Sequence, residues 1–130
     1  MRHRIQTTKP QQFIDITAKV AEEVKKSSAR DGIAVIFVPH TTAGVTINEN
    51  ADPDVVRDMI SALDEACPAH GEYLHLEGNS HAHVKASLMG SSCTVIIRGG
   101  ELMLGRWQGI YFCEFDGPRN RELYVKIIAG

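Results

Sequence analysis

Apolar and polar residues follow one another along this chain in patterns that switch between helical and extended periods. After Thr17, Val20 and Val24 lie four residues apart among charged residues, which predicts a helix that ends at Asp31-Gly32. Residues 32–38 then form a nearly continuous apolar run rich in β-branched side chains. Such a run predicts a strand that is covered on both faces.

Two further helices are predicted from their start signals. Asp52 and Pro53 suit the N-cap and the first helical position of a helix that ends near Cys67-Pro68. Ser80 is expected to cap a short helix over residues 81–89. The other extended segments are residues 1–8, 45–50, 94–97, 101–104, 110–115 and 122–128. Because the late strands follow one another directly, the sequence predicts one α+β domain over residues 1–130, with a mostly antiparallel sheet, two main helices and one short helix packed on it.

Composition narrows the classes of function. The 130 residues include 43% apolar and 23% charged side chains, as in ordinary globular domains. The formal charge of -2, from 14 basic and 16 acidic residues, argues against a nucleic-acid partner. The three cysteines are widely spaced, which favours neither a disulfide framework nor a thiolate zinc site. No apolar run is long enough for a signal peptide or a membrane span, so we expect a cytoplasmic protein with no membrane partner.

Three histidines are candidates for a metal site. His40 directly follows a predicted buried strand, His75 stands two residues from Glu77, and His83 lies near the start of the short helix. Three neutral imidazoles suit Zn²⁺ or a similar transition ion, whereas Mg²⁺, the alternative divalent metal, prefers oxygen ligands. Each histidine also has a structural interpretation: His40 as a ring bonded to loop backbone, His75 on a solvated strand, and His83 on a capped surface helix.

Other residues suggest substrate contacts. Glu114 stands among apolar neighbours, so its carboxylate must meet a cation, a metal or a hydrogen-bond donor. The free amides at the start of the short helix, with Lys85 close by, suit a phosphate or diphosphate group. Trp107 is a candidate to stack on a flat ring, although a lone tryptophan is more often part of a core.

Several segments together resemble the YjbQ family, also described as secondary thiamine-phosphate synthase. The resemblance runs in order through residues 40–54, 75–83, 88–92 and 104–121 and through the closing strand, so that it covers roughly residues 10–128. It implies an α+β homotrimer with a pocket near subunit contacts. It also implies a small-molecule enzyme with weak thiamine-phosphate synthase activity, which joins an aminopyrimidine diphosphate to a thiazole phosphate.

The resemblance assigns roles to residues that match recurrent positions of the family. His40, His75 and His83 fall on recurrent histidines and would hold a divalent metal. The residues expected to bind the small phosphorylated substrate are Asn50, Asn79, Lys85, Trp107 and Gln108, and those expected to orient a ligand or move a proton are Asp52 and Glu114. The alternative is a trimeric module that binds a metal or metabolite through the same residues without catalysis.

Overall fold

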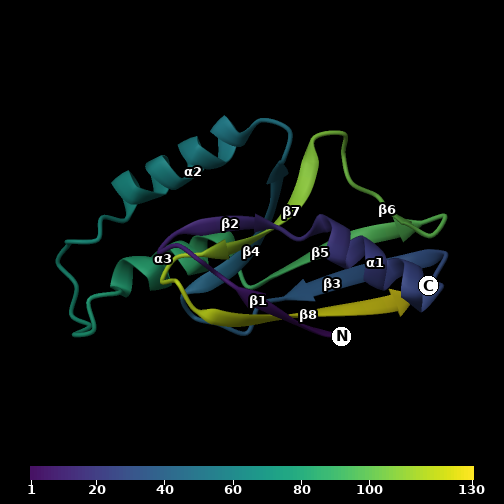
Figure 1. The fold of residues 1–130 in the computed structure, drawn as a ribbon, viewed down its shortest axis with the longest axis horizontal. Helices are drawn as coiled ribbons and strands as arrows, with labels where there is room; N and C mark the ends of the chain where they lie inside the picture. The colour runs from purple at the N-terminus through teal and green to yellow at the C-terminus, as the bar shows by residue number, and fades with distance from the viewer.

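The computed structural model describes residues 1–130 and contains two antiparallel sheets and three helices (Figure 1). Along the chain the elements are β1 Arg2–Gln6, β2 Gln12–Asp15, α1 Thr17–Ser27, β3 Asp31–Phe37, β4 Ala43–Glu49, α2 Pro53–Ala66, α3 Ser80–Met89, β5 Ser92–Arg98, β6 Glu101–Leu102, β7 Gln108–Glu114 and β8 Asn120–Ala129. The larger sheet has the order β1-β8-β3-β5-β6, and the smaller one has the order β2-β7-β4. The predicted single-domain α+β fold is therefore confirmed.

The main core lies between the two sheets and is closed by α1. Val20 and Val24 of α1 are almost fully buried in it, as the helical spacing predicts. A second apolar cluster joins Ala82 and Ala86 of α3 to the outer face of the smaller sheet. As a result β7, the central strand of the smaller sheet, is buried on both faces. In Figure 1, α2 and α3 lie at one end of the molecule, and α1 and β6 lie at the other.

Several boundaries and environments differ from the sequence predictions. Helix α1 ends before Asp31, because Ser28 adopts the left-handed conformation with φ of 59°. The short strand β2 was not predicted, since four residues carry little periodic signal. The prediction that residues 32–38 are covered on both faces is wrong for this chain: Ala34 and Ile36 are buried, but Phe37 is 44% exposed. The start of α3 corrects another prediction: Ser80 is the first residue of the helix and not its cap, because Asn79 holds the N-cap position, without a side-chain cap hydrogen bond.

All three cysteines are free, and burial raises the pKa of the Cys93 thiol to about 11, so that this thiol is protonated at neutral pH. None of the three helices combines the length and the apolar character that crossing a membrane requires.

Candidate functional site

A polar cavity lies where the β3–β4 connection, the segment before α3 and the β7–β8 loop meet. Its volume is about 420 Å³, and we call it the histidine cavity. Its lining has no hydrophobic side chain and consists of Pro39, His40, Thr41, Thr42, His75, Glu77, Asn79, His83, Asp116, Arg119 and Arg121. The fold thus brings the three predicted metal ligands, which are far apart in sequence, to one cavity.

The strand register explains how these segments meet. Ala43 at the start of β4 pairs with Glu114 at the end of β7, so the connection that carries His40 lies beside the β7–β8 loop. That loop is packed tightly at Gly117, where a Cβ atom would lie 2.4 Å from the Lys9 carbonyl oxygen. A glycine at this position therefore allows the loop to approach the N-terminal segment and to hold Arg119 at the cavity.

A buried ion pair forms one wall of the histidine cavity. Arg121 is 5% exposed, and it donates from Nε to Oε1 of Glu114 at 2.9 Å and from Nη2 to Oε2 at 2.5 Å. Nη2 also donates to the Thr42 hydroxyl at 2.8 Å. The Nη1 group makes no hydrogen bond within the chain, so this rigid cation keeps unused donors beside the cavity.

Glu114 is saturated by its neighbours. Besides Arg121, it accepts hydrogen bonds from the Thr7 hydroxyl at 2.8 Å and from the Asp116 amide at 3.0 Å. Burial by itself would raise the pKa of Glu114, but the hydrogen bonds from Arg121, Thr7 and Asp116 outweigh it and lower the pKa. The predicted need for a cation and donors is met inside the protein, and Glu114 therefore positions Arg121 from behind the cavity.

His40 presents a donor to the cavity. Its Nε2 accepts a hydrogen bond from the Glu122 backbone amide at 2.9 Å, so the neutral ring carries its proton on Nδ1. Burial and the nearby Arg121 guanidinium lower the pKa of His40, which favours this neutral form. The structural interpretation of His40 as a ring bonded to backbone is therefore confirmed, but its partner is the backbone of strand β8 and not that of a loop.

His75 and His83 form a pair of rings. Their centroids are 5.5 Å apart, with the planes at 80°. Two imidazoles bound to one tetrahedral zinc ion would have centroids about 5 Å apart. The side chain of Glu77 lies close to that of His75, with 3.8 Å between the Glu77 Oε1 and the His75 Nε2.

As arranged, the three histidines fit a three-imidazole metal site only in part. No three histidine, cysteine or carboxylate side chains are grouped closely enough to hold an ion. His75 and His83 have a spacing that suits a shared ion, whereas the lone pair of His40 is engaged by Glu122. Metal binding at these residues stays a prediction.

Asn79 brings an unpaired acceptor to the cavity. Its Nδ2 donates to Oδ2 of Asp116 at 2.9 Å, while its Oδ1 is buried without a partner in the chain. Asp116 also accepts from Nη2 of Arg119 at 3.0 Å, which fixes that guanidinium at the rim. Buried polar atoms without a partner are rare in folded proteins, and Oδ1 is therefore a natural acceptor for a ligand hydroxyl.

Lys85 does not reach the histidine cavity, which corrects its expected role in receiving a phosphate. Its side chain is 1% exposed, and Nζ donates to Oδ1 of Asp64 on α2 at 2.5 Å and to Oε1 of Gln11 at 2.9 Å. Hydrogen bonding from Lys85 lowers the pKa of Asp64. Lys85 therefore joins α3 to α2. This burial could not be predicted from residue type, because lysine is normally exposed.

The remaining predicted residues lie at the opposite end of the β4–β7 pair. Glu49 pairs there with Gln108, six residues along each strand from Ala43 and Glu114, a separation of about 20 Å. Asp52 accepts a hydrogen bond from the Asp54 amide at 2.9 Å and is the N-cap of α2, as its helix-start signal predicts. The other three residues at this end are Asn50, Trp107 and Gln108.

Sequence reasoning missed the arginines and threonines of the cavity. The sequence does contain one signal for Arg121. It stands just after the predicted β7–β8 loop, and Glu114 stands just before that loop. Two opposite charges at neighbouring ends of antiparallel strands are candidates for an ion pair. Arg119, Thr41 and Thr42 lie in loop segments whose direction the pattern of residues cannot give.

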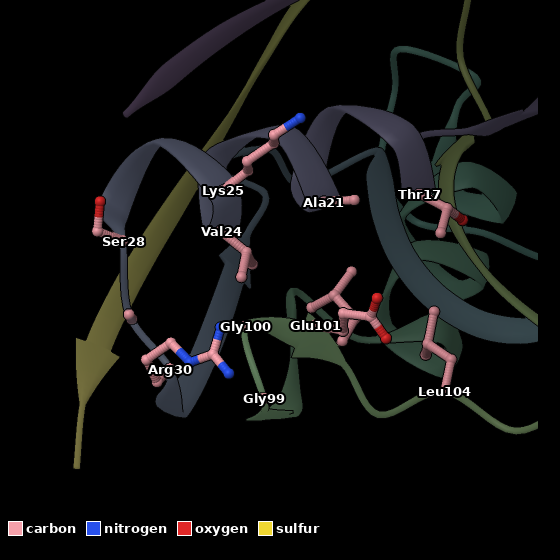
Figure 2. A pocket seen from close by; sticks show the side chains of 12 residues that line it. Thr17, Ala21, Val24, Lys25, Ser28, Arg30, Gly99, Gly100, Glu101 and Leu104 are labelled. Atoms are coloured by element: carbon pink, nitrogen blue, oxygen red, sulfur yellow. The ribbon is translucent and has the colours of Figure 1, made fainter.

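A larger hollow lies elsewhere, between α1 and the β5–β6 turn (Figure 2). It has a volume of about 680 Å³, and its charged residues are Lys25, Arg30 and Glu101 around Val24 and Leu104. It contains no histidine, cysteine or unpaired buried group, and we therefore place the candidate site at the histidine cavity.

Comparison with known proteins shows which family the chain belongs to. The family model described as "UPF0047 protein YjbQ-like" matches residues 1–130. This chain belongs to that family. It is 55% identical to UPF0047 protein MJ1081 of Methanocaldococcus jannaschii over 98% of this chain and 93% of the relative, and 52% identical to YugU of Bacillus subtilis over 97% and 96%.

Solved structures of family members share the fold. A YjbQ/UPF0047 protein of Clostridium acetobutylicum superposes with a TM-score of 0.97 at 60% identity, covering 98% of this chain and 99% of the other. A YbjQ-like protein of Sulfolobus solfataricus gives a TM-score of 0.96 at 32% identity, covering 100% and 96%. The arrangement of two sheets and three helices is thus shared by the YjbQ-like family across distant relatives.

Proposed function

We propose that this YjbQ-like protein is an enzyme that binds a small phosphorylated molecule in the histidine cavity. The observation that carries the proposal is the guanidinium of Arg121, which is buried, rigid and without a partner at Nη1. Arginine with spare donors is well suited to phosphate, because its planar fork matches two phosphate oxygens.

Further groups around the cavity support a phosphate ligand. The Nδ1–H of His40 and the hydroxyl of Thr41 add donors, and Arg119 adds a second guanidinium. The free Oδ1 of Asn79 is an acceptor for a protonated phosphate oxygen or a substrate hydroxyl. Two guanidinium groups among neutral donors suit a phosphate group.

The specific reaction we propose is weak thiamine-phosphate synthesis. The bond from the aminopyrimidine methylene carbon to the diphosphate oxygen breaks, a bond from that carbon to the thiazole nitrogen forms, and pyrophosphate leaves. Arg119 and Arg121 stabilise the charge that develops on the departing pyrophosphate. A zinc-like divalent ion at His75 and His83 is part of the proposal, and when bound it would neutralise further charge.

Turnover by the purified protein tests this proposal. The protein is mixed with aminopyrimidine diphosphate and thiazole phosphate, and thiamine phosphate is measured against a His83→Ala control. Product that depends on His83 and falls at least tenfold in Arg121→Lys supports an enzyme. Substrate binding without product in any sample would instead identify a non-catalytic binding module.

We also propose that the protein works as a cytoplasmic homotrimer. Support comes from the open face of the larger sheet, where Phe37, Ile96, Tyr124 and Ile128 are between 40% and 57% exposed. An exposed apolar patch of this kind is typical of an interaction surface. Sedimentation equilibrium should give about 43 kDa, three times the chain mass of 14.3 kDa, and a mass of one chain would refute the trimer.

A further inference from the structure

We propose that the histidine cavity is one lobe of a two-lobed site, and that the second lobe binds an uncharged organic part of the same substrate. The second lobe is a hollow of about 490 Å³ that shares His40, Thr41 and His83 with the histidine cavity. Its own lining residues are Ala43, Ala86, Ser87, Gly90 and Ser91. This inference rests on the proposed phosphate site for the position of the charged group.

The second lobe has a rigid floor. The end of α3 lies directly against β4, since a Cβ atom at Gly44 would lie 2.7 Å from the Gly90 carbonyl oxygen. That same oxygen accepts a hydrogen bond from the Val45 amide at 3.0 Å, and the Ser91 carbonyl accepts one from Val38 at 2.7 Å. The backbone is therefore fixed on both sides of the turn, and small side chains leave the space above it open.

The chemistry of the second lobe differs from that of the first. Apart from the shared histidines it has no titratable side chain, and its other polar side chains are the hydroxyls of Thr41, Ser87 and Ser91. Ser87 donates to the His83 carbonyl at 3.0 Å, which leaves its oxygen free to accept, and Ser91 has an unbonded hydroxyl. Such a surface suits a neutral group that carries one or two hydrogen-bonding atoms.

The two lobes meet at His40 and His83. A phosphate beside Arg121 and an organic group beside Ser87 would place the bond that joins them next to these two rings. The substrate class is therefore a phosphate or diphosphate ester of a small uncharged organic group. Free phosphate would fill only the first lobe.

Paired titrations with inorganic phosphate and phenyl phosphate test the inference. We expect phenyl phosphate to bind about tenfold more tightly, because it adds a buried ring to the same charged group. In amide NMR spectra, phosphate should shift signals of Arg119 and Arg121, and phenyl phosphate should in addition shift Ser87, Gly90 and Ser91. Equal affinities with identical shifts would overturn the second lobe, whereas no binding of either ligand would overturn the proposed phosphate site.

Filling the second lobe provides the variant test. Ser87→Phe and Ser91→Phe both add a ring at an exposed position of the lining, and Ser92→Phe is the matched control because Ser92 is exposed outside it. Both lobe variants should lose the tenfold advantage of phenyl phosphate and keep the affinity for inorganic phosphate. Retention of the advantage in both folded variants would contradict the inference.

Discussion

The guanidinium of Arg121 and the carboxylate of Glu114 form a buried ion pair across the loop that joins β7 to β8. Glu114 is fully buried, and Arg121 keeps only one small edge at the histidine cavity. The pair therefore links the interior of the smaller sheet to the candidate site. Its geometry fixes where the unused donors of Arg121 are held.

Removing the charge of Glu114 should destabilise the protein. Glu114→Gln leaves the Arg121 cation buried without a counter-charge, and breaking such pairs costs about 3–5 kcal/mol in the free energy of unfolding. Urea denaturation followed by circular dichroism measures this loss. The double variant Glu114→Gln with Arg121→Met should recover part of it, and a single variant as stable as the parent would contradict the burial of an essential pair.

The same carboxylate predicts how stability depends on pH. The pKa of Glu114 is below its ordinary value of 4.5 in the folded protein, so the unfolded state binds more protons in this range. The stabilisation is complete above about pH 4.5 and is lost as the pH falls through the lowered pKa. Between pH 5 and 3 the unfolding free energy of the parent should fall more steeply than that of Glu114→Gln. Parallel profiles would show that other carboxylates, such as Asp64, account for the acid sensitivity.

Replacement of Lys85 should lower the stability of the fold and leave ligand binding unchanged. Lys85→Met keeps most of the buried stem and removes the bonds to Asp64 and Gln11. We expect a lower melting temperature and a phosphate affinity within twofold of the parent. Arg57→Met is a control for the loss of a cation, since the Arg57 side chain is 80% exposed. A fivefold loss of phosphate affinity in folded Lys85→Met would restore Lys85 to the substrate site.

Metal binding is expected to depend most on His75 and His83, whose rings lie side by side. Zinc titration should show about one ion per chain, and His75→Ala and His83→Ala should each weaken it at least tenfold. His40→Ala should have a smaller effect, because the His40 lone pair already bonds to Glu122. His70→Ala is the matched control at an exposed histidine outside the cavity. Zinc affinity that is unchanged in both ring variants would remove the ligand assignment.

Local signals in the sequence are sufficient to predict most of the helices and strands of the fold. The Asp52-Pro53 start of α2 and the valine spacing of α1 follow from capping and periodicity, which act within a few residues. The histidines could be chosen from their residue type and from local context, namely the strand end before His40, Glu77 beside His75 and the helix start before His83. That Glu114 needs a partner was also predictable from its apolar neighbours.

The remaining features depend on contacts between distant segments. Arg121 and Thr42 are 79 residues apart, and only the pairing of β4 with β7 and the return of β8 bring them together. Lys85 is buried because Asp64 and Gln11 converge on it, which no pattern around Lys85 indicates. Asn50, Trp107 and Gln108 likewise lie far from the histidine cavity because they are at one end of the β4–β7 pair and the cavity is at the other.

The most direct test of the account is the affinity of inorganic phosphate for the parent protein and for Arg121→Lys, measured by isothermal titration calorimetry. Lysine keeps a positive charge for Glu114 but lacks the second terminal nitrogen of the guanidinium. We expect at least a tenfold rise in the phosphate Kd, with the fold retained by circular dichroism. An unchanged Kd in the folded variant would contradict the claim that Arg121 binds the phosphate.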